Sequence, residues 1–177
     1  AERYNDALPL YKEAFAARPG DNALAVEYQR CQLAADRAAG EEFMQKGDVE
    51  LKAGRLREAA EFYRQAQTAK NPPPDIDKKL LAVERRLLMQ AAEIQLKKAL
   101  ASGGASGAEE VAAVAELLGQ LADFRRRNEE QFDSKLSELQ ARLLLMRARQ
   151  SMVAKDYPAA QDDLAELGRV ETEDPAD

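Results

Sequence analysis

Two separate stretches of the chain carry nearly the same pattern of apolar and charged residues. "FMQKGDVELKAG" spans residues 43–54 and "LMQAAEIQLKKA" spans 88–99, and a looser third copy, "LLMRARQSMVAK", spans 144–155. Internal duplication of a helical segment is the sequence signature of stacked repeat units, because one such unit cannot bury its apolar face alone. The copies therefore restrict the chain to repeated helical units.

Glycine and proline clusters separate segments in which apolar residues recur at helical spacing. The low aromatic content, 6%, and the abundance of Ala, Leu, Glu, Arg and Gln also favour helices. The connections between the predicted helices are only a few residues long, so neighbouring helices should run antiparallel. Gly40 marks a place where the second helix is expected to kink or split. The predicted helices cover residues 2–18, 22–53, 56–70, 75–101, 108–127, 129–155 and 158–168.

Small and large residues alternate in the helices that follow the first and third copies. The series are Leu56, Ala59, Tyr63, Ala66 and Tyr157, Ala160, Leu164, Leu167, and the N-terminus has a further copy, Tyr4, Ala7, Tyr11, Ala14. Closely packed helices need small side chains where they cross and large ones beside the crossing. We expect Gly47 to cross Ala59 and Ala148 to cross Ala160, with Tyr63 and Leu164 filling gaps towards the next repeat.

The stretch "YNDALPLYKEAFAARPGD" (4–21), with the copies above, resembles the tetratricopeptide repeat (TPR) family. The resemblance implies an all-α, antiparallel helix-hairpin solenoid, here with elongated helices, because the copies lie further apart than the family period of about 34 residues. We expect a single domain over 1–177: a half repeat (1–21), hairpin units 22–74, 75–128 and 129–168, and a polar tail (169–177). Since the chain begins directly in a helical pattern, we interpret it as a fragment of a longer protein.

In the TPR register, the first helix of each unit presents four positions to a concave groove. The resemblance therefore implies a partner-binding groove formed by Met44, Asp48 and Leu51, by Arg86, Met89, Glu93 and Leu96, and by Arg142, Leu145, Arg149 and Met152. Glu41 takes the remaining slot. The alternative is that these side chains pack against the extended parts of neighbouring helices and close the groove.

The composition excludes several other functions. The chain has no histidine, which removes the commonest general base and metal ligand, and we expect no catalytic, cofactor or metal site. The net charge of −6 disfavours nucleic acid, and no apolar stretch is long enough to span a membrane. The lone Cys31 is expected in the core and favours a reducing compartment such as the cytoplasm. "FRRRN" (124–128) is expected to be a helix C-terminus, and "SGGASG" (102–107) a flexible connector.

The sequence thus predicts a non-enzymatic protein–protein interaction scaffold whose partner is another protein or a peptide. The alternative is a helical-bundle or coiled-coil module in which the long helices mediate self-association.

Overall fold

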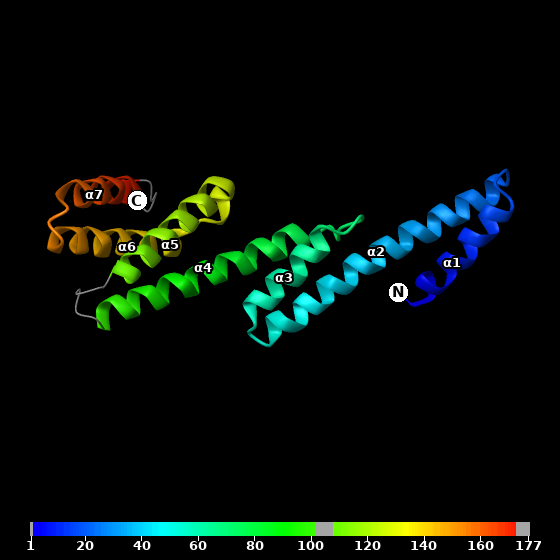
Figure 1. Ribbon diagram of the computed structural model, residues 1–177, viewed down its shortest axis with the longest axis horizontal. Helices are drawn as coiled ribbons and strands as arrows, with labels where there is room; N and C mark the ends of the chain where they lie inside the picture. Colours follow the sequence, from blue (N-terminus) through cyan, green and yellow to red (C-terminus); the bar gives the residue numbers. More distant parts are fainter. Residues whose placement is uncertain (1, 102–107, 173–177) are drawn as a thin grey trace. The chain divides into compact units, whose positions relative to one another are not determined.

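The computed structural model describes residues 2–101 and 108–172, and these residues form seven α-helices and one 3₁₀ turn with no strand (Figure 1). The predicted connector 102–107 and the end of the predicted tail, 173–177, lie outside the described residues. The all-α prediction is confirmed for the described part of the chain. The elements are α1 (Glu2–Ala17), α2 (Asn22–Lys52), α3 (Leu56–Gln67), α4 (Ile76–Ala101), α5 (Ala108–Arg127), η1 (Glu129–Gln131), α6 (Ser134–Val153) and α7 (Tyr157–Thr172).

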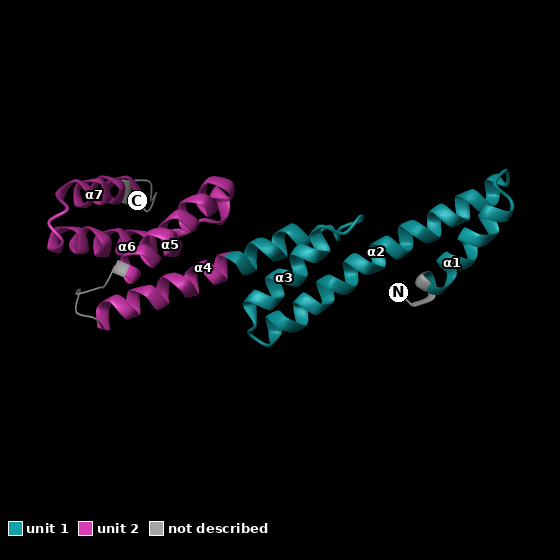
Figure 2. Ribbon diagram, viewed as in Figure 1, with its two compact units in different colours: residues 1–84 teal, residues 85–177 magenta. Residues whose placement is uncertain are grey.

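The chain divides into two compact units, residues 1–84 and 85–177, and the boundary falls inside α4 (Figure 2). In the first unit α2 packs against both α1 and α3, and in the second unit α6 packs against both α5 and α7. Among the described helices, none has a stretch both long and apolar enough to cross a membrane.

The start of α2 is set by Asp21, whose carboxylate accepts hydrogen bonds from the backbone N–H groups of Ala23 and Leu24. This satisfies two of the donors that a helix N-terminus leaves unpaired. The helix then runs unbroken past Gly40, so the expected split does not occur. Gly40 lies against the loop after α3: an added Cβ would come within 3.1 Å of the Asn71 carbonyl oxygen and of Pro73 Cδ. The glycine therefore provides room for that loop.

The core of the first unit lies between α2 and α3 and continues onto the start of α4. Ala59 and Tyr63 are fully buried, and so is Ala66. At the start of α4 the apolar side chains that recur at helical spacing are also buried, namely Ile76, Leu80 and Val83. At the other end of the unit, the Phe15 ring of α1 stacks on the Tyr28 ring of α2, and Cys31 is buried as expected.

The core of the second unit is formed by α5 and α6, with α7 packed on α6. Its buried apolar side chains include Val114, Leu117, Leu118, Leu121, Phe124, Leu136, Leu139, Leu143 and Leu144. The helix α6 begins at Ser134 rather than near 129, because the 3₁₀ turn precedes it and Asp133 caps it by accepting from Leu136 N–H. The last helix extends to Thr172, beyond the predicted end at 168.

The turns of the α2–α3 and α6–α7 hairpins have the same hydrogen bonds at matching positions of the first and third sequence copies. In each hairpin a backbone N–H just beyond the first helix donates a hydrogen bond to a backbone carbonyl near the end of that helix. Arg55 N–H donates to the Glu50 carbonyl in one hairpin, and Asp156 N–H donates to the Ser151 carbonyl in the other. Gly54 and Lys155 occupy the left-handed position with φ of +77° and +62°. This is the Schellman geometry that ends a helix, so the repeated sequence forms the same turn twice.

Candidate partner-binding cleft

The two hairpins differ in how their predicted crossing residues pack. In the first unit Gly47 lies directly against the ring of Tyr63, since an added Cβ would be 2.4 Å from Tyr63 Cε1. In the second unit Ala148 and Ala160 are buried, but Leu164, which matches Tyr63, has 49% of its surface exposed. Thus Tyr63 fills its place in the first unit, whereas Leu164 does not fill the matching place in the second.

Asp48, a predicted groove residue, is engaged inside the first unit. Its carboxylate accepts a 2.6 Å hydrogen bond from the Tyr63 hydroxyl and a 2.6 Å ion pair from Lys79 of α4. Burial alone would raise the pKa of Asp48, but the hydrogen bonds from Lys79 and Tyr63 and the charges of Lys79 and Lys52 outweigh it and lower the pKa below its ordinary value. The other two predicted residues of this unit, Met44 and Leu51, are half-buried.

The predicted residues on α4 belong to the second unit and separate into two groups. Arg86 is exposed and Met89 is half-buried, and Glu93 forms a 3.5 Å ion pair with Lys135 of α6. Only Leu96, which is half-buried, contributes to the cleft described below. The predicted acidic side of the groove, Asp48 and Glu93, is therefore neutralised by lysines of neighbouring helices.

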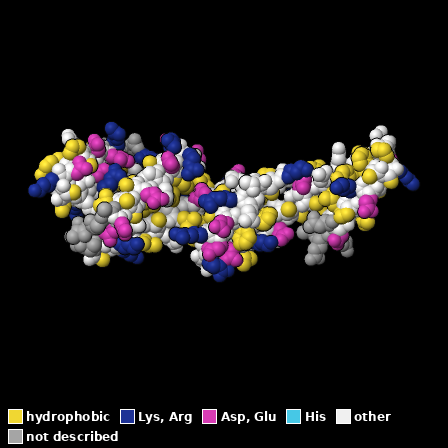
Figure 3. All heavy atoms as spheres, viewed as in Figure 1, with side chains coloured by type: hydrophobic (Ala, Val, Ile, Leu, Met, Phe, Trp, Pro, Cys, Tyr) yellow, Lys and Arg dark blue, Asp and Glu magenta, His cyan; other side chains and the backbone are white. Residues whose placement is uncertain are grey.

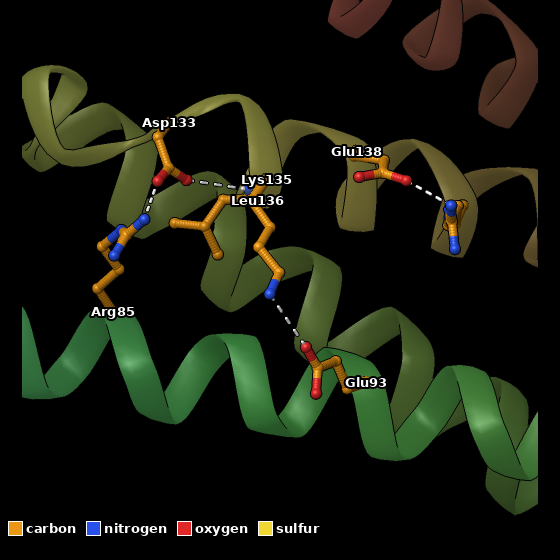
Figure 4. A network of polar contacts seen from close by, with 7 residues as sticks. Arg85, Glu93, Asp133, Lys135, Leu136 and Glu138 are labelled. Atoms are coloured by element: carbon orange, nitrogen blue, oxygen red, sulfur yellow. Dashed lines mark hydrogen bonds and ion pairs between the residues drawn. The ribbon is translucent and has the colours of Figure 1, made fainter.

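Two ion pairs join α4 to the beginning of α6 (Figure 4). Arg85 pairs with Asp133, the residue that also caps α6, and Lys135 reaches back to Glu93. Asp133 thus stabilises the start of α6 and contacts α4 with the same carboxylate. These contacts join the middle of α4 to the beginning of α6.

A cleft of about 770 Å³ lies between the last turns of α4, the outer face of α6 and one side chain of α7. Five predicted groove residues line it, namely Leu96, Arg142, Leu145, Arg149 and Met152. The four on α6 are exposed and lie on one stripe of the helix, since residues three, four and seven positions apart share a face. The structure therefore brings these five predicted residues together around one hollow.

The cleft is apolar with a positive charge. Its lining contains two arginines and no aspartate or glutamate. Arg142 pairs with Glu138 one turn earlier on the same helix, whereas Arg149 has no ion pair or hydrogen bond to any side chain in the described part of the chain. The wall also contains Gln150, which is buried and whose two amide atoms have no partner among the described residues.

Several lining residues were not predicted from the sequence. They are Ala99, Leu100, Met146, Ala148, Gln150, Val153 and Leu164. Leu164 had a signal, because it matches Tyr63 in the repeat and is smaller. The TPR register gave no signal for Leu100 and Val153, which are 82% and 76% exposed at the ends of their helices.

Charged side chains elsewhere on the molecule mostly pair locally. Figure 3 shows both signs interspersed over the visible face of each unit. In the "FRRRN" stretch, Arg126 pairs with Asp123 and the Arg125 guanidinium lies 5.3 Å from the centre of the Phe132 ring, as suits the end of α5. No cluster of Cys, Asp or Glu side chains in residues 2–101 and 108–172 could hold a metal ion.

Comparisons with models of protein families, with curated proteins and with solved structures find no match to this chain.

Proposed function

We propose that this protein is a non-enzymatic interaction scaffold built from TPR-like helical hairpins, and that the cleft on α6 docks an apolar segment of a partner protein. The observation that carries the proposal is the convergence of Leu96, Leu145 and Met152 on one cleft of about 770 Å³. The repeated Schellman turns of the two hairpins support the solenoid interpretation.

The cleft has the chemistry of a peptide-binding groove. Met152 and Leu145 are 53% and 38% exposed, and an apolar segment that covered them would remove this surface from water. Methionine and leucine side chains also adapt their shape to different apolar partners. This arrangement suits the mode in which the apolar face of an amphipathic helix lies in a hydrophobic groove.

Site-specific photo-cross-linking tests this proposal with the full chain. A photoreactive amino acid replaces Met152 in the cleft or, as a matched control, Val49, an apolar residue of α2 that is 61% exposed. Mass spectrometry identifies the cross-linked protein, and its affinity is then measured with purified components.

We expect Met152→Asp to abolish binding of that partner and Val49→Asp to leave it unchanged, with both variants folded by circular dichroism. The proposal fails if both variants bind the partner as the unmodified chain does. Unfolding caused by Met152→Asp would show instead that this side chain belongs to the core.

Self-association is a second candidate, favoured by exposed large apolar side chains in the first unit. Leu10 is 67% exposed on α1, and Val26 and Leu33, seven positions apart on α2, are 47% and 55% exposed. Such a stripe fits a helix of a second copy. Sedimentation equilibrium of the full chain decides it: a dimer that Leu33→Asp converts to a monomer supports this candidate, and a monomer at all concentrations refutes it.

A further inference from the structure

The first unit shows how one of these hairpins receives an additional helix. The start of α4 contributes buried Ile76, Leu80 and Val83 to the core of that unit. The same helix delivers Lys79 to Asp48 of α2, with its Nζ 2.6 Å from the carboxylate. The docked segment therefore combines an apolar stripe with charges opposite to those on the hairpin, since Glu84 of the same segment also pairs with Arg64 of α3, 2.9 Å apart.

The second hairpin has the matching position with the charge reversed. In the aligned copies Asp48 corresponds to Arg149, and Tyr63 corresponds to Leu164. Both Arg149 and Leu164 line the cleft. Unlike Asp48, Arg149 has no ionic partner within the described residues.

We propose that the cleft binds an amphipathic helix of another protein that carries an acidic residue among its apolar ones, and that this carboxylate pairs with Arg149. The inference rests on the proposed docking function and specifies the chemistry of the partner. The helix takes the role on α6–α7 that the start of α4 takes on α2–α3, with the signs of the two charges exchanged.

The charge of the cleft favours this occupant over a second copy of the chain. The lining has two arginines and no carboxylate, although the whole chain has a net charge of −6. Opposite charges across an interface set its orientation and exclude partners of the same sign. The chain's own docking segment carries Lys79 at the decisive position, which would repel Arg149.

A peptide with the sequence of the start of α4 tests which charge the cleft prefers. It covers residues 75–87 with the substitution Lys79→Glu, and the matched control keeps the lysine. A cross-link between positions 78 and 82, both exposed in α4, holds each peptide helical, because short isolated helices are marginal in water. Fluorescence anisotropy measures binding of each peptide to the full chain and to its variants.

We expect the Lys79→Glu peptide to bind the unmodified chain, and Arg149→Glu to weaken that binding about tenfold, a factor that corresponds to about 1.4 kcal/mol. The lysine peptide should bind the Arg149→Glu variant more tightly than it binds the unmodified chain. Arg126→Glu, an exposed substitution on α5, should change neither affinity.

Each contrary result has a separate meaning. Equal binding of both peptides, abolished by Leu145→Asp, refutes the pairing with Arg149 and leaves the docking function intact. Binding of neither peptide to the unmodified chain overturns the inference, and cross-linking at Met152 still decides the proposed function. A dimer that Arg149→Glu dissociates would identify the occupant as a second copy and would also overturn it.

Discussion

Replacing Gly47 with alanine tests the packing of the first hairpin most directly. The added methyl carbon would lie 2.4 and 2.5 Å from two ring carbons of Tyr63, whereas nonbonded carbons prefer about 3.5–4.0 Å. The ring has little room to move, because Tyr63 is fully buried and its hydroxyl is bonded to Asp48. The helix and the ring must therefore separate by about 1 Å.

Two opposing free-energy terms set the expected result. Alanine is favoured over glycine in a helix by about 1 kcal/mol, and an overpacked core loses about 1–3 kcal/mol. The added methyl group overlaps a ring that is buried and held by its hydrogen bond to Asp48. We therefore expect the cost of overpacking to exceed the gain in helix propensity, and the variant to lose about 1–2 kcal/mol of unfolding free energy. Gly119→Ala is the matched control, since nothing lies within 4 Å of its added methyl group, and it should gain about 0.5–1 kcal/mol.

The assay must resolve the two units, because bulk unfolding of a chain with two compact units need not be two-state. Hydrogen exchange read by mass spectrometry measures the opening free energy of α2–α3 separately from that of α5–α6. We expect Gly47→Ala to speed exchange in α2–α3 alone. Equal stabilisation by Gly47→Ala and Gly119→Ala would falsify the packing argument.

A double-mutant cycle adds a second test of the same contact. The second hairpin has alanine and leucine, Ala148 and Leu164, at the positions of Gly47 and Tyr63. Tyr63→Leu should be destabilising alone, because it removes the hydroxyl bonded to Asp48 and part of a buried ring. Combined with Gly47→Ala, it should cost about 1–3 kcal/mol less than the sum of the single changes. Strict additivity would show that the two residues do not conflict.

Three further predictions concern polar groups. The lowered pKa of Asp48 stabilises the fold at neutral pH, and this contribution is lost as pH falls from the ordinary aspartate pKa, about 3.9, through the lower folded value. Asp48→Asn should therefore reduce the stability that the first unit loses between neutral pH and about pH 3, measured by hydrogen exchange along an acid titration. Arg147→Met should cost the second unit about 3 kcal/mol of opening free energy, measured by hydrogen exchange, because it leaves the buried Asp163 carboxylate without the guanidinium whose Nε lies 2.8 Å away. No loss would show that the pair is solvated. Gln150→Leu should stabilise the second unit by about 1 kcal/mol in the same assay, because it removes two buried amide atoms that have no partner in the described structure. A loss of stability would show that the amide is hydrogen-bonded in solution.

The sequence by itself determined the helices and the chemistry of their ends. Asp21 caps α2, and such a cap depends only on atoms that lie within a few residues of one another in the sequence. Gly54 falls at the left-handed turn position because glycine lacks the side chain that penalises it. The burial of Ala59 and Ala160 also followed from the repeated small residues, because helices can approach closely only where side chains are small.

The tertiary structure alone decided which predicted groove residues share a site. Slots that are equivalent in the repeat differ in the structure, because Asp48 is paired by a lysine thirty-one positions away and Arg149 is not. Such pairings depend on where distant helices come together, which local periodicity does not encode. The cleft likewise depends on the last turns of α4, the outer face of α6 and Leu164 of α7 coming together around one hollow, which no local pattern encodes.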